Sequence, residues 1–389
     1  MSDKTIQTLK ITNYKSIDSL ELKGLAPFSV FAGPNGSGKS NFFDALNFVS
    51  LFIQSGIEIA QRAHGGFNNF HSEKRRKEKS RKFTFEIECS LENPDNDNPS
   101  REIYHYNLNI YDLDKHPKIE ERLSIDEKTI LNRKKDGNPE IIRNTKENIS
   151  IESFPKTYSA LLLFSGNPIV NFLRNMSLYR IDPIGAKEPD QSDSDPSKLD
   201  KKGHNLASVL RRLESNEQHK QTILDWMATI VPGLEKILTE QQQLESKTAI
   251  LFKEKNTRRR FPAHMISDGT VYALSLLVAV LDRPENFGLT TIEEPERGLH
   301  PTAIQELIAL IRDQATANQP IWMTTHSESV VRQLRLEELV LVNKPGGRTR
   351  MKIADAGNLS NENLAPLGLD EAWLSNLLDG GTPTAVPVK

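Results

Sequence analysis

The sequence predicts an α/β protein, and three observations carry this prediction. A short apolar run, residues 28–32, leads into a glycine-rich loop and then into a helix with apolar residues at helical spacing. Strands and helices alternate between residues 270 and 343, which is typical of a parallel sheet. Residues 67–176 instead carry alternating, β-forming runs separated by polar turns. We therefore expect an α/β head with a mixed β lobe and an inserted β/helical arm region.

The expected elements divide into three parts. In residues 1–66, the expected strands are Thr5–Asn13, Ile17–Leu22 and Phe28–Ala32, followed by a loop and a helix through Phe52. In residues 67–176, we expect strands Lys82–Leu91, Ile103–Tyr111 and Lys118–Ile125, then a helical stretch over Tyr158–Met176. In residues 177–389, the expected strands are Leu178–Asp182, Ala249–Lys253, Leu289–Ile292, Ile321–Thr324 and Leu339–Asn343. The expected helices are Leu206–Leu213, Glu217–Val231, Thr270–Leu281, Thr302–Thr316 and Ser327–Leu334.

Composition narrows the class of protein. The chain has 389 residues, of which 37% are hydrophobic and 26% charged, so a disordered or membrane-embedded chain is not expected. No apolar run is long enough to span a bilayer, the first residues are polar, and Cys89 is the only cysteine. These features predict a cytoplasmic protein without disulfides or a cysteine-rich metal site.

The charge is close to balanced, but it is unevenly placed. The formal net charge is −2, which does not by itself indicate nucleic-acid binding. Basic residues nevertheless cluster at Lys74–Lys82 and again at Arg258–Arg260. Such clusters can neutralise backbone phosphates, although each is equally compatible with a solvated loop. DNA is therefore a candidate partner.

The strongest functional signal is a complete phosphate-binding loop, residues 33–40, with the pattern G-x-x-x-x-G-K-[ST]. Its glycines let successive N–H groups point at phosphate oxygens, and the helix that follows presents its positive end to the same anion. Lys39 is expected to reach the β- and γ-phosphates and Ser40 to bind Mg²⁺. The expected nucleotide-binding residues are Gly33, Asn35, Gly36, Ser37, Gly38, Lys39, Ser40 and Asn41.

Two further strand ends carry the chemistry that hydrolysis needs. A short apolar strand ends in Glu293 and Glu294, an arrangement called Walker B. The first carboxylate is expected to hold Mg²⁺, directly or through water, and the second to polarise the attacking water. Glu293 stands where aspartate is commoner and is one methylene longer. At the end of another strand, His326 can hydrogen-bond the γ-phosphate and report its loss.

A fourth element, Ser267-Asp268-Gly269-Thr270, comes directly before an expected helix. A serine in this position is an ordinary helix cap. Its hydroxyl and the exposed N–H groups also suit a phosphate. If the chain's own loop already holds a nucleotide, Ser267 and Gly269 could bind the nucleotide of a second subunit.

These four elements in this order resemble the ABC-type ATPase heads of the RecF/SMC/OLD-like group, and more closely the ABC-like "AAA family ATPases" of the AAA_21 type. The resemblance covers both ends of the chain and leaves only the middle insertion unanchored. Beyond the four elements it rests on residues 9–17, on Gly203-His204-Asn205-Leu206-Ala207, on Glu293-Glu294-Pro295-Glu296, on Gly298-Leu299-His300-Pro301 and on residues 368–373.

The resemblance implies ATP and Mg²⁺ as cofactors and a homodimer, or a higher oligomer of dimers, that closes around two ATP molecules. It implies that Glu294 is the general base, that His326 is a switch histidine, and that Ser267 and Gly269 form a signature motif completing the partner's site. Gly298–Pro301 would link the two sites. The signature reads S-D-G-T rather than the longer S-G-G-Q, so the contact across the dimer is in question. The Q-loop glutamine cannot be placed; Gln54, Gln61 and the neighbourhood of His71 are weak candidates.

Three roles are compatible with this machinery. The first is the motor or sensor subunit of a DNA-maintenance or anti-phage defence system. OLD-like chains of the group that this sequence resembles carry a fused nuclease with a D-x-D motif after the ATPase part. No D-x-D follows His326 here, so the resemblance implies no nuclease in this chain, and a nuclease or toxin effector would be a separate, co-encoded protein. The second is a regulatory ATP-binding scaffold with little turnover, which the atypical Glu293 keeps open. The third is a transporter subunit, which the long β insertion disfavours, so no membrane partner is expected.

Overall fold

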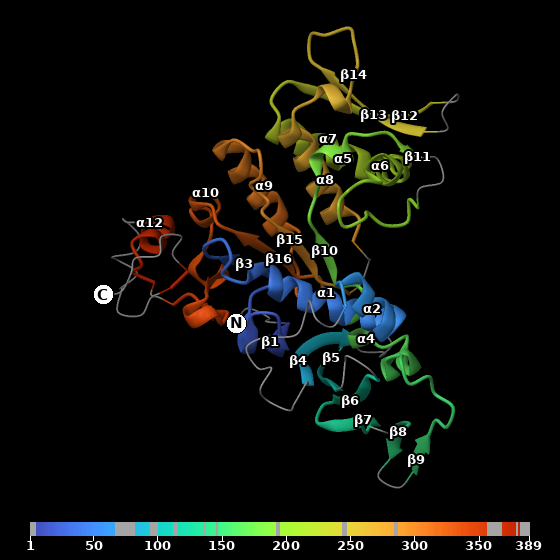
Figure 1. The fold of residues 1–389 in the computed structure, drawn as a ribbon. Coiled ribbons are helices and arrows are strands. Elements are labelled where there is room, and N and C mark those ends of the chain that lie inside the picture. Colours follow the sequence, from blue (N-terminus) through green and yellow to red (C-terminus); the bar gives the residue numbers. More distant parts are fainter. Residues whose placement is uncertain are drawn as a thin grey trace.

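The computed structural model describes residues 5–66, 82–93, 100–111, 116–135, 137–144, 147–191, 195–242, 247–283, 287–355, 368–378 and 380–381. The basic run at 74–81, His71 and the polar turn at 94–99 lie outside these ranges. The described strands form three sheets, and the elements run through the molecule as Figure 1 shows.

The central sheet is parallel over five of its six strands, as the alternation of strands and helices predicted. Its order is β10-β15-β16-β3-β17-β18, and only the β17–β18 pair is antiparallel. The strands are β10 (Ser177–Tyr179), β15 (Thr290–Glu293), β16 (Ile321–Thr325), β3 (Phe28–Ala32), β17 (Leu339–Asn343) and β18 (Arg350–Ile353).

An antiparallel sheet of eight strands lies on the other side of α1 (Lys39–Ser55). Its order is β2-β1-β4-β5-β6-β7-β8-β9, so strands from residues 1–66 and from residues 67–176 pair within one sheet. The strands are β1 (Ile6–Tyr14), β2 (Ile17–Leu25), β4 (Lys82–Asn93), β5 (Ser100–Tyr111), β6 (Lys118–Ile125), β7 (Lys128–Arg133), β8 (Pro139–Asn144) and β9 (Glu147–Ser150). The division into 1–66, 67–176 and 177–389 stays a prediction.

Helices cover the far face of the central sheet, and a small third sheet packs on the outer side of these helices (Figure 1). That sheet consists of β11 (Asp190–Gln191), β12 (Leu234–Gln242), β13 (Lys247–Glu254) and β14 (Phe261–Pro262). The helices of this half are α5 (Pro183–Ala186), α6 (Leu206–Glu214), α7 (Glu217–Ile230), α8 (Asp268–Leu281), α9 (Pro301–Asp313), α10 (Glu328–Val331) and α12 (Leu369–Leu374). On the side of the antiparallel sheet lie α2 (Ile57–Ala63) and α4 (Pro168–Arg174).

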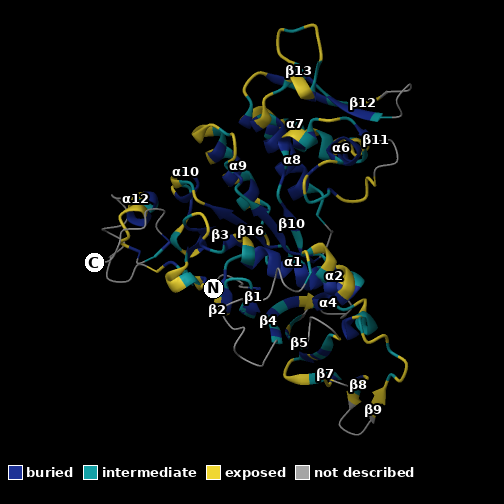
Figure 2. Ribbon diagram, viewed as in Figure 1, coloured by how far each residue is buried: buried dark blue, intermediate teal, exposed yellow. Residues whose placement is uncertain are grey.

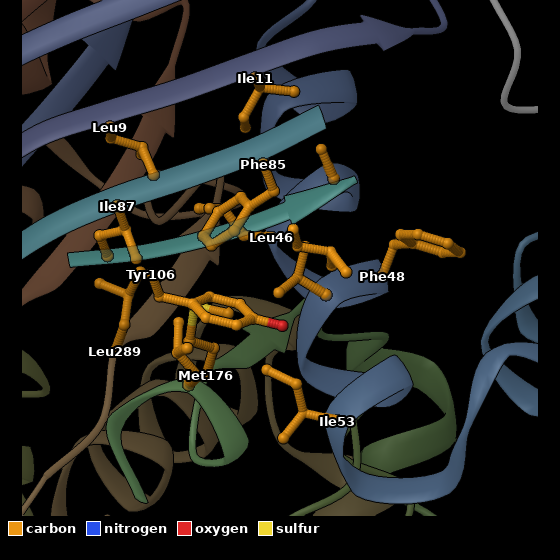
Figure 3. Close-up of a cluster of buried hydrophobic side chains, with 14 of the residues drawn as sticks. Leu9, Ile11, Leu46, Phe48, Ile53, Phe85, Ile87, Tyr106, Met176 and Leu289 are labelled. Carbon is orange, nitrogen blue, oxygen red and sulfur yellow. The ribbon is translucent and has the colours of Figure 1, made fainter. Parts of the chain in front are cut away.

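The central sheet separates two hydrophobic cores, because side chains alternate along each strand. On β3, Phe31 packs into the core shared with α1 and the antiparallel sheet, whereas Val30 faces the core shared with α8 and α9. Trp322 and Met323 divide in the same way on β16. Figure 2 shows both cores as buried layers, and Figure 3 shows the first, with Leu9 and Ile11 of β1 and Leu46 of α1 gathered around Phe85 and Tyr106. Helix α1 is buried between the two sheets, which fixes the loop at its start.

Two predicted helical stretches were wrong in extent, and some strands were not predicted. Tyr158–Met176 is not one helix but a 3₁₀ turn, Ala160–Phe164, followed by α4. The helix expected over Ser327–Leu334 is limited to α10. Strand β12 was missed, because its residues Glu235, Lys236 and Glu240–Gln242 are polar and give no alternation.

Candidate nucleotide-binding site

The phosphate-binding loop joins β3 to α1, as the sequence predicted. Gly36 and Gly38 have φ angles of 76° and 104°, in the left-handed region that suits glycine. Gly38 is the N-cap of α1, with no side-chain cap and no acidic residue in the first turn, so the positive end of the helix is left for an anion. Asn35 and Ser40 are exposed, whereas the Ser37 hydroxyl is buried and finds no hydrogen-bond partner among the residues that the structure describes.

A further set of side chains, which was not predicted from the sequence, supports this loop. The Thr349 hydroxyl donates to the Ser37 carbonyl at 3.0 Å and lies 2.6 Å from Ser16 Oγ. Asn41 Nδ2 donates to the same Ser16 hydroxyl at 2.6 Å. Asn41 therefore ties the start of α1 to the turn before β2 through Ser16.

Lys39 lies among the carboxylates expected to act with it. Its ammonium group folds back and donates to the carbonyls of Gly33 at 2.7 Å and Pro34 at 3.1 Å. Burial lowers the pKa of Lys39, while the negative charges of three nearby carboxylates oppose that shift. These carboxylates belong to Glu294, Glu296 and Glu293.

The parallel register explains why these groups meet. Glu293 lies opposite Thr324 on the next strand, and Thr325 lies opposite Ala32, the residue before the phosphate loop. The Gly33 N–H donates to the Thr325 carbonyl at 3.3 Å. Three neighbouring strands thus deliver the loop, the paired acids and His326 to one edge of the sheet, where ligands of such sheets usually bind.

Glu293 does not point freely into the site. Arg180, directly after β10, binds both carboxylate oxygens of Glu293, with distances of 2.7 and 2.8 Å. The same guanidinium lies 3.0 Å from Asp44 on α1, and Lys15 binds the other Asp44 oxygen at 2.6 Å. Burial would raise the pKa of Asp44, but Arg180 and Lys15 hold it below its usual range.

Glu294 and His326 lie side by side on adjacent strand ends. Glu294 Oε1 is 3.4 Å from His326 Nδ1, and both side chains are more than 40% exposed, so a substrate can reach them. Glu294 has a left-handed φ of 51°, unusual for a residue other than glycine. The Tyr272 hydroxyl of α8 donates to the carbonyls of Glu293 and Glu294, at 3.0 and 2.8 Å, and holds this turn.

Glu296, for which the sequence motif predicts no role, connects two of the functional loops. Its Oε1 accepts from the Thr325 hydroxyl at 2.7 Å and from the His326 N–H at 3.4 Å. Its Oε2 is buried, with no hydrogen-bond partner in the described part of the chain. Burial raises the pKa of Glu296, although the Thr325 hydrogen bond counteracts it. Glu296 therefore ties the segment after Glu294 to the loop that carries His326.

The Ser267 motif caps α8 and lies against the segment after Glu296. The Ser267 hydroxyl accepts from Thr270 N–H at 3.2 Å and remains exposed. A Cβ on Gly269 would overlap the Gly298 carbonyl oxygen, so only glycine allows α8 to approach this closely. Lys187 forms an ion pair with Asp268 of the motif. Ser267 thus hydrogen-bonds to Thr270 within the start of its own helix.

The two described Q-loop candidates lie away from the phosphate-binding loop. Gln54 donates to Ser50 Oγ at 3.0 Å and also to the Arg174 carbonyl. It is 15 residues along α1 from Lys39, or roughly 22 Å at the helical rise. Gln61 is on α2, and His71 lies outside the described residues.

The donor groups at the start of α1 suit a hard cation. Ser40 offers an exposed hydroxyl, and the carboxylates of Glu293 and Asp44 lie on the neighbouring elements. In the part of the chain that the structure describes, no three His, Cys, Asp or Glu side chains gather so as to hold a metal by themselves. A Mg²⁺ ion at this site would therefore need oxygens from a nucleotide and from water, as is usual for that ion.

Comparison with known proteins agrees with this geometry. The family model described as "AAA domain, putative AbiEii toxin, Type IV TA system" matches residues 28–332, well over half of the chain. The chain belongs to this family. It is an ABC-like ATPase domain of the AAA_21 type, related to SMC and RecF proteins.

Two curated relatives match short segments. The chromosome partition protein Smc of Methanocaldococcus jannaschii is 37% identical over 71 residues, covering 18% of this chain and 6% of that protein. The DNA replication and repair protein RecF of Corynebacterium jeikeium is 29% identical over 75 residues, covering 16% and 18%. The matches thus span less than a fifth of these relatives.

The fold has a match among solved structures. The structure of "the SmcHead bound to the C-winged helix domain of ScpA" superimposes with a TM-score of 0.56 at 11% identity. The match covers 89% of this chain and 97% of that one. The expected ABC-type P-loop ATPase head is confirmed as the fold. No helix among the described residues is both long and apolar enough to cross a membrane.

Proposed function

We propose that this chain binds and hydrolyses ATP and dimerises when ATP is bound. The observation that carries the proposal is the convergence of the phosphate loop, Glu294 and His326 at one edge of the central sheet. Family membership supports the use of ATP and Mg²⁺, since ATPases of this type use both. The roles of individual residues below are part of the proposal.

In the proposed reaction, the N–H groups of residues 36–39 bind the phosphate chain. Lys39 exchanges its loop carbonyls for β- and γ-phosphate oxygens. Ser40 and Glu293 would hold Mg²⁺, which would supply positive charge beside the β- and γ-phosphates. Glu294 accepts a proton from the attacking water, and its exposed side chain leaves room for that water. His326 donates a hydrogen bond to the γ-phosphate and loses it when phosphate leaves.

The proposed dimer places Ser267 and Gly269 of each chain on the ATP of its partner. Two features support this arrangement: the Ser267 hydroxyl is exposed, and α8 packs on the loop beside Glu294 through Gly269 and Gly298. The binding of a nucleotide between two chains would then affect the turn that carries the general base, Glu294. Hydrolysis removes the γ-phosphate bridge and opens the dimer.

We further propose a cytoplasmic role in DNA maintenance or anti-phage defence, with a separate effector protein. The family description names a putative toxin system, and Smc and RecF are named for chromosome partition and for DNA replication and repair. Arg258, Arg259 and Arg260 are exposed at the turn between β13 and β14, where DNA phosphates could be contacted. DNA, a homodimer and a nuclease or toxin are therefore the proposed partners.

One observation favours the alternative of an ATP-binding scaffold with little turnover. Glu293, the expected Mg²⁺ ligand, is already held by Arg180 through two hydrogen bonds. If that clamp persisted with nucleotide bound, Mg²⁺ would be poorly placed for hydrolysis. A transporter subunit has no comparable support from the geometry.

Phosphate release separates an active ATPase from a scaffold. The wild-type chain is expected to release phosphate continuously, and Glu294→Gln is expected to bind ATP but to turn over at least about 100-fold more slowly, because it lacks the base. Lys39→Ala is the control that should lose nucleotide binding as well. A wild-type rate equal to that of Glu294→Gln, with ATP bound in both, would favour the scaffold.

A further inference from the structure

Arg180 lies at the centre of a chain of ion pairs that connects four parts of the nucleotide site. Its guanidinium binds both oxygens of Glu293 and lies 3.0 Å from Asp44 Oδ1. Asp44 Oδ2 is bound in turn by Lys15, in the turn between β1 and β2. These side chains are mostly buried: Asp44 and Glu293 are exposed by 10% and 15%, and Arg180 by 32%.

The position of this cation matters because of the two carboxylates that it bridges. Asp44 follows Ser40 by four residues on α1, so the two side chains lie on the same face of the helix. Glu293 reaches the same region from the end of β15. Arg180 therefore holds a positive charge between two carboxylates that flank the hydroxyl expected to bind Mg²⁺.

We propose that Arg180 is the resident counter-cation of the metal site and competes with Mg²⁺ for Glu293. When Mg²⁺ and ATP bind, Glu293 leaves the guanidinium, and Asp44 retains it. Arg180 is thus a positioning residue that sets the Mg²⁺ concentration the site requires. This inference rests on the proposed nucleotide site and adds to it a defined exchange of partners.

The chemistry of the groups favours an exchange over simultaneous binding. A bidentate guanidinium engages both oxygens of a carboxylate in a fixed plane. Mg²⁺ demands near-octahedral geometry and keeps several of its waters, so it needs a Glu293 oxygen aimed into the site. Two cations on one half-buried carboxylate also repel each other. The extra methylene of glutamate, compared with aspartate, lets this carboxylate swing between the two cations while the strand stays in place.

The surrounding charges agree with this account. Lys201 also lies near Arg180. Burial and the charge of Arg180 lower the pKa of Lys201, while the negative charges of Asp44 and Glu293 act to raise it. Lys15, Arg180 and Lys201 thus surround Asp44 and Glu293 before any metal is added, and Lys39 adds a further positive charge near Glu293. A divalent cation entering this cluster must displace positive charge, and Arg180 is the group that directly holds Glu293.

The test measures binding rather than turnover. In a Glu294→Gln background, a fluorescent ATP analogue is titrated with Mg²⁺, and the Mg²⁺ concentration for half-maximal binding is recorded. Arg180→Gln is expected to lower that concentration about tenfold, because it removes the competing charge. Asp44→Asn is expected to raise it several-fold, because Arg180 then has Glu293 as its only carboxylate partner and one negative charge is lost.

The opposite signs distinguish competition from a structural role, which would weaken binding in both variants. Arg312→Gln is the matched control: Arg312 binds Glu338 with the same two-point geometry, at 2.8 and 2.9 Å, outside the nucleotide site. It should leave the Mg²⁺ dependence unchanged. If Arg180→Gln fails to fold, Arg180→Lys replaces it, and a smaller decrease is expected because lysine cannot bind both oxygens in the same plane.

An unchanged or higher half-maximal Mg²⁺ concentration in Arg180→Gln would overturn the inference while leaving the proposed ATPase intact. If the Glu294→Gln parent shows no Mg²⁺-dependent nucleotide binding at all, the proposed function itself is wrong. The two failures are therefore distinguishable within one experiment.

Discussion

Gly38→Ala tests the packing beneath the phosphate loop. Gly38 has a φ of 104°, and a Cβ at this position would overlap Thr349 Oγ1 and lie 2.9 Å from Ser16 Oγ and 3.0 Å from Thr349 Cβ. Gly36 also has a positive φ, 76°, but a Cβ there meets no atom within 4 Å. The two glycines therefore differ in steric surroundings while sharing a left-handed backbone, so Gly36→Ala is the matched control.

The expected costs follow from these two terms. A non-glycine residue in the left-handed region costs about 1 to 2 kcal/mol, and this applies to both variants. Overpacking against Thr349 adds about 1 to 3 kcal/mol for Gly38→Ala alone. We expect the free energy of unfolding, measured by urea denaturation without nucleotide, to fall by about 1 kcal/mol for Gly36→Ala and about 3 kcal/mol for Gly38→Ala.

A double-mutant cycle identifies the cause. In a Thr349→Ala background the hydroxyl is gone but the Cβ remains, so Gly38→Ala should cost about 1 kcal/mol less than in the wild type. Equal costs for Gly36→Ala and Gly38→Ala, or no coupling with Thr349, would refute the close approach as the reason for glycine at position 38.

Three further outcomes are expected. Glu121 is fully buried and paired with Arg133 at 3.2 Å, so Glu121→Gln should lower the free energy of unfolding by about 3 to 5 kcal/mol in a denaturant titration, because Arg133 stays buried without its counter-charge. Burial raises the pKa of Asp190 from 3.8 to about 6, which favours its protonated form in the folded chain. Its stabilising contribution is therefore present below pH 3.8 and lost as the pH rises through about 6. Between pH 4 and 7 the free energy of unfolding of the wild type should fall by about 2 to 3 kcal/mol relative to that of Asp190→Asn. Parallel curves of unfolding free energy against pH for the two proteins would contradict this. Glu296→Ala should slow phosphate release about tenfold, because Thr325 and His326 lose their hydrogen-bond acceptor. Glu296→Gln keeps an acceptor oxygen and should slow phosphate release less. Equal rates in the two variants would argue against a positioning role for Glu296.

The parallel core was predictable from the sequence because its elements are short, strongly apolar and punctuated by recognisable ends. Residues 28–32 are buried along their whole length and lead directly into the phosphate loop, and 290–293 ends in the paired acids. Motif spacing then implied that these strand ends share an edge, since parallel strands connected by helices point the same way.

The supporting residues could not be predicted in the same way. Thr349 lies 311 residues beyond Gly38 in a polar stretch without a pattern. The pairing of β18 with β17 and the bond from the Thr349 N–H to the Ser16 carbonyl, at 2.9 Å, bring it to the loop. Arg180 follows an expected strand, but nothing local indicates that Glu293 is its partner. Asp44 is the exception, because its spacing of four residues from Ser40 could have placed it on the same helix face.

The polar strands were missed for a related physical reason. The alternation of apolar and polar residues is a reliable signal of a strand only where one face of the sheet is buried and the other is exposed to solvent. On β12 Leu234 and Ile237 are buried, whereas Lys236, Glu240 and Gln241 are exposed, and pairing with β13 rather than an alternating pattern of side chains defines the strand. The residues of such a strand therefore give little indication that it is a strand.

The most direct test of the composite site is the molar mass of Glu294→Gln in solution with and without ATP and Mg²⁺, measured by light scattering after size exclusion. The account predicts one chain mass of 43.9 kDa without nucleotide and twice that mass with ATP, and reversal by Ser267→Arg, which should block the partner's phosphate. A mass that stays at one chain while ATP is demonstrably bound, or a doubling that Ser267→Arg does not affect, would contradict a site completed by a second copy.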